Sequence, residues 1–149
     1  MSLEPEVYRL RPPFVRDGVR YLEYGSPDLE RQPRPRADLR VDYPRSAALA
    51  NTTAWVTVQL FIDRSGRVKE TSRICGAPQF AEAVAGAARA ARFDPAQRRG
   101  GSLAPSTIVV EVAFLGRAAP SDEDSLDRLR AGLQDACLRE IFGASRRLR

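Results

Sequence analysis

Histidine is absent from this chain of 149 residues. Without an imidazole, no Ser-His or Cys-His catalytic pair and no histidine metal ligand can form. The two cysteines, Cys75 and Cys137, lack the Cys-x-x-Cys spacing of zinc sites. No Walker A loop, dinucleotide-binding fingerprint or calcium-binding loop is found either. We therefore expect a protein that is not an enzyme and that has no metal site and no cofactor.

Long apolar runs are also lacking, since no stretch approaches the roughly 18 residues that a membrane-spanning helix requires. We expect no membrane span in this chain. Met1 is either a native start or the point at which a signal or membrane anchor was removed, and the sequence leaves both readings open. Cys75 and Cys137 could pair in an oxidising compartment or remain as buried thiols, and this too is left open.

Lysine is nearly missing: Lys69 is the single lysine among the 24 basic residues, which exceed the 19 acidic residues to give a net charge of +5. A solvated basic surface is the simplest interpretation. A basic nucleic-acid-binding domain is an alternative. Its patch would comprise Arg89, Arg92, Arg98, Arg99 and residues 146–149. Because the aromatic strand motif of RNA-recognition sheets and the spacing of helix-turn-helix proteins are both absent, we expect no nucleic acid.

Proline and arginine dominate residues 1–41, which we interpret as an N-terminal extension with an extended arm and one short strand at 19–24. Residues 42–117 have the patterns of a folded domain. Residues 118–149 combine an amphipathic helix with a basic tail. The sequence thus predicts three segments with these boundaries.

The folded segment alternates between helical and strand patterns. Residues 44–49 predict a short helix, 55–62 and 67–74 two strands joined by a turn at Asp63 to Gly66, 79–92 a helix, 97–105 a loop and 107–115 a strand. We therefore expect an α+β fold: a small antiparallel three-stranded sheet, formed by a hairpin and one later strand, packed on a helix. An additional helix follows at the C-terminus.

That C-terminal helix is predicted over residues 121–142, with Ser121 as its N-cap and Gly143 at its end. Its apolar stripe comprises Leu126, Leu129, Leu133, Cys137 and Ile141. The stripe has three possible places: over the sheet face that carries Trp55, Thr57 and Phe61, alongside the last strand, or against a partner.

The order and spacing of several residues resemble the TonB C-terminal domain. The set comprises Tyr43, Pro44 and Ala47; Phe61, Ile62, Asp63, Gly66 and Val68; Phe93, Pro95 and Ala96; and the strand 108–114. These positions cover about half of the chain. Each also has a structural explanation as a core residue, a turn or a helix end, so the resemblance concerns the fold more directly than the function.

The resemblance implies a periplasmic protein-binding module of energy transduction and transport. In this family the last strand captures an extended segment of an outer-membrane transporter by β-strand addition. The corresponding partner-binding residues here are Thr107, Ile108, Val109, Val110, Glu111, Val112, Ala113 and Phe114. An adaptor or structural subunit of a cell-envelope complex is the alternative, and an open edge would also allow strand exchange in a homodimer.

The sequence departs from the family in its missing anchor and in its added C-terminal helix. Candidate residues for a secondary interface are Trp55, Phe61, Leu126, Leu129 and Leu133, and Cys75 and Cys137 are the candidates for a disulfide. Periplasmic localisation is expected if a signal or anchor was removed, and the location is otherwise unknown.

Overall fold

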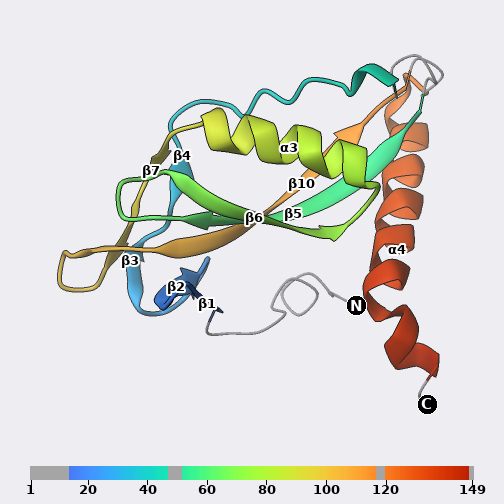
Figure 1. The fold of residues 1–149 in the computed structure, drawn as a ribbon. Helices are drawn as coiled ribbons and strands as arrows, with labels where there is room; N and C mark the ends of the chain where they lie inside the picture. Colours follow the sequence, from blue (N-terminus) through green and yellow to red (C-terminus); the bar gives the residue numbers. More distant parts are fainter. Residues whose placement is uncertain (1–13, 47–51, 117–119, 148–149) are drawn as a thin grey trace.

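The structure, a computed structural model, describes residues 14–46, 52–116 and 120–147, and its fold is drawn in Figure 1. Its elements are, in chain order, β1 (Phe14–Arg16), β2 (Val19–Glu23), β3 (Leu29–Arg31), β4 (Arg34–Pro35), β5 (Ala54–Ile62), β6 (Val68–Cys75), α3 (Pro78–Ala90), β7 (Phe93–Asp94), β8 (Ala96–Arg98), β9 (Leu103–Ala104), β10 (Ser106–Phe114) and α4 (Glu123–Arg147).

A five-stranded sheet in the order β1-β2-β10-β5-β6 forms the centre of the molecule. The long strands β5 and β10 pair antiparallel without a register shift, from Ser106 opposite Ile62 to Phe114 opposite Ala54. β5 also pairs antiparallel with β6. The α+β class expected from the sequence is confirmed.

The turn of the β5–β6 hairpin lies at Asp63 to Gly66, as the sequence predicts. The Asp63 carboxylate accepts hydrogen bonds from the backbone N–H of Ser65 and of Arg67, at 2.9 and 3.0 Å. Gly66 has φ of 85° and its carbonyl accepts a bond of 2.9 Å from the Phe93 N–H. A Cβ at Gly66 would lie 1.9 Å from the Phe93 carbonyl oxygen, so this position requires glycine.

One face of the sheet packs against α3, as Figure 1 shows. The strand residues Val56, Val58, Leu60 and Ile62 meet Phe80, Val84 and Ala88 of the helix in the main core cluster, which Phe93 and Phe114 complete. The alanines of α3 allow this close approach. Complete burial of each large apolar side chain stabilises the fold by about 1.5–3 kcal/mol.

The opposite face, which carries Thr57, Gln59 and Phe61, is also buried. Tyr21 of β2 packs edge-on against Phe61, with ring centroids 5.2 Å apart. The Arg16 guanidinium lies 4.9 Å from the centre of the Phe61 ring and pairs with Glu70 at 3.7 Å. The β1–β2 hairpin thus covers one end of this face, while α4 packs against β5 and β6 at the other end (Figure 1).

The sheet has five strands, whereas the sequence predicts three. The difference comes from residues 14–23, which we interpreted as part of an extended arm with one strand. They form the β1–β2 hairpin because Asp17 and Gly18 adopt positive φ and reverse the chain. The predicted loop 97–105 is likewise largely a small hairpin, β8–β9, which pairs with β3.

Helix α4 begins and ends at other residues than predicted. Asp122, not Ser121, caps the helix, because its carboxylate accepts a 2.9 Å hydrogen bond from the Ser125 N–H. The Ser125 hydroxyl and backbone bonds lower the pKa of Asp122. The helix also continues past Gly143, since one glycine costs a helix only about 1 kcal/mol.

Two predicted features lie at least partly outside the described residues. Arg45 and Ser46 are helical, as predicted for 44–49, but residues 47–49 are not described. The side chains of Ile141 and of the predicted basic tail, residues 146–149, are also outside the description. Among the described residues, no helix is both long and apolar enough to cross a bilayer.

Candidate functional site: the outer edge of strand β10

Strand β10 contains all the residues predicted to bind a partner by strand addition, and its backbone groups alternate between two directions. In an antiparallel strand, the N–H and C=O of one residue point to the same side, and the next residue points to the other. The Thr107 carbonyl accepts a hydrogen bond from Tyr24, on the β2 side. Val109, Glu111 and Ala113 therefore also direct their backbone groups away from β5.

The first part of this edge is already occupied by β2. The two strands run parallel, with Leu22 opposite Ser106 and Glu23 opposite Thr107. Hydrogen bonds of 3.0 Å join the Leu22 N–H to the Pro105 carbonyl and the Tyr24 N–H to the Thr107 carbonyl. The pairing is short, so β2 protects only the beginning of the edge.

Further along β10 the edge is different. Among the described residues, no strand lies beside Val109 or Ala113 on the side away from β5. Both side chains are half-buried and share the sheet face of Thr57 and Gln59. An extended partner could therefore pair with this part of β10 without disturbing the β5 ladder.

The remaining predicted edge residues, Ile108, Val110, Val112 and Phe114, belong to the α3 face. Phe114 is buried, with its ring 4.7 Å from that of Phe80. Ile108, Val110 and Val112 pack against the same core but stay partly exposed. They hold β10 in place, and their exposed portions form an apolar margin along the edge.

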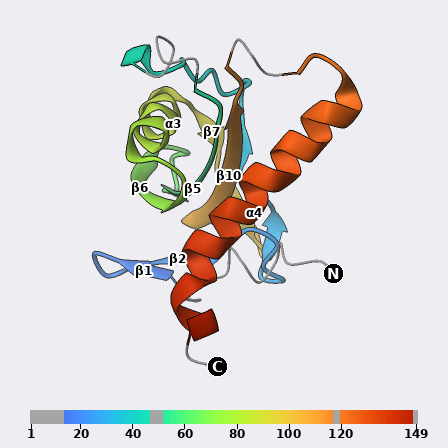
Figure 2. The same cartoon turned by 90° about the vertical axis from the view of Figure 1, so that its right-hand side faces the viewer.

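Helix α4 occupies the first of the three places considered from the sequence, the sheet face that carries Thr57. Cys137 of α4 is buried, pairs with Cys75 in a disulfide with Cα atoms 5.4 Å apart, and lies 3.5 Å from the Thr57 hydroxyl. The helix crosses one end of the sheet and packs chiefly on β5 and β6 (Figures 1 and 2).

The residues of the predicted secondary interface lie at separate places and differ in burial. Phe61 is fully buried beneath Tyr21 and Arg16, so it is not available to a partner in this structure. Trp55 is half-buried at the other end of β5. Leu126, Leu129 and Leu133 are half-buried on α4.

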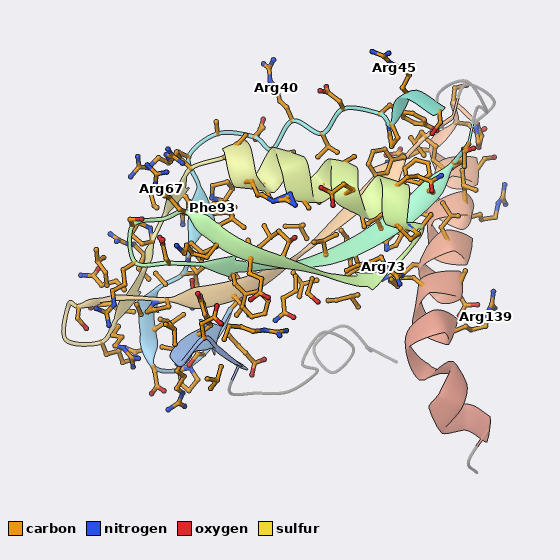
Figure 3. The ribbon with its side chains drawn as sticks, viewed as in Figure 1. Arg40, Arg45, Arg67, Arg73, Phe93 and Arg139 are labelled. Atoms are coloured by element: carbon orange, nitrogen blue, oxygen red, sulfur yellow. A yellow bond between two sulfur atoms is a disulfide. The ribbon has the colours of Figure 1, made fainter. Side chains whose placement is uncertain are left out.

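Two of the basic residues considered for nucleic acid, Arg89 and Arg99, have local partners for their side chains. Arg89 pairs with Glu82 at 3.2 Å on α3, and the Arg99 guanidinium donates to the Pro27 carbonyl. Arg67 lies beside Phe93 at the closed end of the β5–β6 hairpin, whereas Arg73 lies at the opposite end, close to α4 (Figure 3). In the described part of the chain, no group of three or more Cys, Asp or Glu side chains could hold a metal ion.

Leu22, Tyr24 and Gly25, at the end of β2 beside β10, were not among the predicted site residues. Val19 to Tyr24 was recognised as a strand, but nothing in its composition shows which strand it joins. The positive φ of Gly25, at 86°, could have been suspected from a Gly-Ser-Pro turn.

A sheet edge that is partly open among the described residues is the feature by which many protein-interaction domains add a strand of their partner. The sequence profile of the family described as "Gram-negative bacterial TonB protein C-terminal" matches residues 40–115. The chain belongs to this family, a periplasmic, non-catalytic interaction domain of energy transduction.

A solved structure supports the fold. The chain is similar to the C-terminal domain of TonB from Pseudomonas aeruginosa, determined by NMR in solution, with a TM-score of 0.50 and 21% identity. The match covers 66% of this chain and 96% of the Pseudomonas domain. No curated protein matches the chain.

Proposed function

We propose that this domain binds an extended segment of an outer-membrane transporter by adding it as a strand to the outer edge of β10, beyond Thr107. The observation that carries the proposal is the edge around Val109 and Ala113, whose backbone groups point away from β5 with no described strand beside them. Main-chain pairing would supply affinity, and the side chains along the edge would supply selectivity.

The position of α4 favours this function over that of an adaptor with a closed edge. The helix is attached through Cys137 to β6, on the far side of β5 from β10, and it packs chiefly on β5 and β6. The pairing of Cys75 with Cys137 also supports a periplasmic location, because disulfides persist in oxidising compartments.

Peptide titration followed by backbone NMR tests the proposal. The probes are synthetic seven-residue peptides that copy the periplasmic N-terminal segments of outer-membrane transporters from the same bacterium. Binding should shift the amide resonances of Val109 and Ala113 and slow their hydrogen exchange, because their N–H groups become donors to the added strand. Resonances of β6 should change little.

Val109→Pro supplies the discriminating variant. Proline has no N–H, and the N–H of Val109 that it removes points away from β5. The hydrogen bonds between β5 and β10 are therefore retained, while one donor to the peptide is lost. We expect Kd to rise about tenfold, corresponding to one lost hydrogen bond. Val109→Ala keeps the N–H and is the matched control.

If the peptides bind equally well to wild type and Val109→Pro, or shift only β6 and α4, strand addition at β10 is wrong. If no peptide binds and the protein is a dimer with β10 protected, the edge pairs with a second copy instead.

A further inference from the structure

Tyr24 is a large aromatic side chain that remains 59% exposed at the point where β2 leaves the edge of β10. Its N–H makes the last described hydrogen bond from this segment to β10, to the Thr107 carbonyl at 3.0 Å. The backbone of Tyr24 is thus fixed to the sheet while its ring faces solvent. An exposed aromatic ring beside an open strand edge suggests a contact for a partner.

The register of β2 determines the face on which this ring lies. Leu22 is opposite Ser106 and Glu23 is opposite Thr107, so Tyr24 comes next to Ile108. Side chains alternate along paired strands, which places Tyr24 on the same face as Ile108, Val110 and Val112. These three side chains are partly exposed, and Tyr24 extends their apolar margin at its beginning.

The turn after Tyr24 prevents β2 from continuing along β10. Gly25 adopts φ of 86°, and its N–H donates to the Gln32 side-chain oxygen at 2.8 Å. The Ser26 N–H also bonds to the Glu23 carbonyl at 3.0 Å. The chain therefore turns away immediately after Tyr24, which leaves the later part of the edge to another strand.

We propose that Tyr24 is a specificity-determining contact for the strand that β10 binds. The partner is a short extended segment that begins beside Tyr24 and runs along Val109 to Phe114, a length of about 20 Å for six residues. It carries an apolar or β-branched side chain at the position next to the Tyr24 ring and at alternate positions thereafter. This inference rests on the proposed function, and it adds the end point and the side-chain pattern of the partner.

Two peptide probes and three variants of the full chain test the role of Tyr24. One probe is the transporter-derived seven-residue peptide that binds wild type most tightly. The other has its apolar residue nearest Tyr24 replaced by serine. Tyr24→Ala removes the ring and keeps the backbone N–H, Tyr24→Phe keeps the ring, and Val15→Ala truncates a comparably exposed apolar residue, 58% exposed, on the separate strand β1.

We expect Tyr24→Ala to weaken binding of the first peptide about three- to tenfold, the range of one aromatic cross-strand contact. Tyr24→Phe and Val15→Ala should bind it like wild type. The serine peptide should bind wild type weakly and should lose little more on Tyr24→Ala, because the contact is already absent. Hydrogen exchange at Leu22 and Tyr24 must stay slow in every variant, which shows that β2 remains paired.

The outcomes separate this inference from the proposed function. If Val109→Pro weakens peptide binding but Tyr24→Ala does not, Tyr24 has no role in recognition, while strand addition to β10 still holds. An equal loss for both peptides also overturns it, because the effect would then be indirect. If no peptide binds wild type at β10, the proposed function and this inference both fail.

Discussion

The attachment of α4 depends on the Cys75–Cys137 disulfide, and breaking this bond is the most informative perturbation of the fold. Among the side chains of α4 that are described, those of residues 123–137 and of Arg139, Cys137 alone is buried. Leu126, Leu129 and Leu133 are half-buried. We predict that reduction, or Cys137→Ser, releases α4 from the sheet while β5 and β10 remain folded.

The magnitude follows from the loop that the disulfide closes. The cysteines are 62 residues apart, for which the chain-entropy relation gives about 4 kcal/mol at 25 °C as an upper value. Three half-buried leucines contribute about 2–4 kcal/mol together. The disulfide is therefore expected to contribute about as much to the docking of α4 as the packing of its leucines does.

Hydrogen exchange measured by mass spectrometry in the presence and absence of a thiol reductant provides the assay. Amides of residues 123–137 should exchange at least a hundredfold faster after reduction, since about 3 kcal/mol of opening free energy is lost. Amides of β5 and β10 should keep their protection. Cys75→Ser should reproduce the effect of Cys137→Ser without reductant.

Unchanged protection of α4 after reduction would refute the reasoning, because packing alone would then hold the helix. Cooperative loss of protection in β5 and β10 together with α4 would also refute it. In that case the helix would be part of the main cooperative unit.

Three further predictions concern the β5–β6 turn and the packing of β2 on the sheet. Gly66→Ala should destabilise the fold by about 2–4 kcal/mol in urea, because its Cβ would meet the Phe93 carbonyl and φ is positive there. Partial burial acts to raise the pKa of Asp63, but hydrogen bonds from Ser65 and Arg67 in the turn lower it overall. The ionised Asp63 therefore stabilises the fold above about pH 4, and this stabilisation is lost as the pH falls through the lowered pKa. The urea midpoints of wild type and Asp63→Asn should therefore converge in acid. Tyr21→Ala should lower the free energy of unfolding by about 2–4 kcal/mol and expose Phe61, which faster hydrogen exchange in β2 would detect. Weaker peptide binding with unchanged protection of β2 would contradict the packing role of Tyr21.

Local patterns were sufficient for the central elements of the fold. The alternation in residues 55–62, the Asp63 and Gly66 turn and the alanine-rich stripe of α3 identify a hairpin followed by a helix, because these signals depend on neighbours in sequence. The ordered positions from Tyr43 to Phe114 indicated the family, which the profile match over residues 40–115 confirms. The helix ends were less well predicted, since Asp122 and Ser121 are both suitable caps.

Tertiary structure decided which strand meets which edge and how much of β10 remains open. Residues 19–23 read as a strand from their composition, but strand pairing is a long-range contact, and no local pattern specifies that Leu22 should lie opposite Ser106. The same holds for Cys75 and Cys137, which are 62 residues apart in sequence and 5.4 Å apart between Cα atoms. Sequence alone therefore determined the central elements and the family. The extent of the binding edge depends on contacts between distant segments, whose free energy is realised only when the whole sheet is assembled.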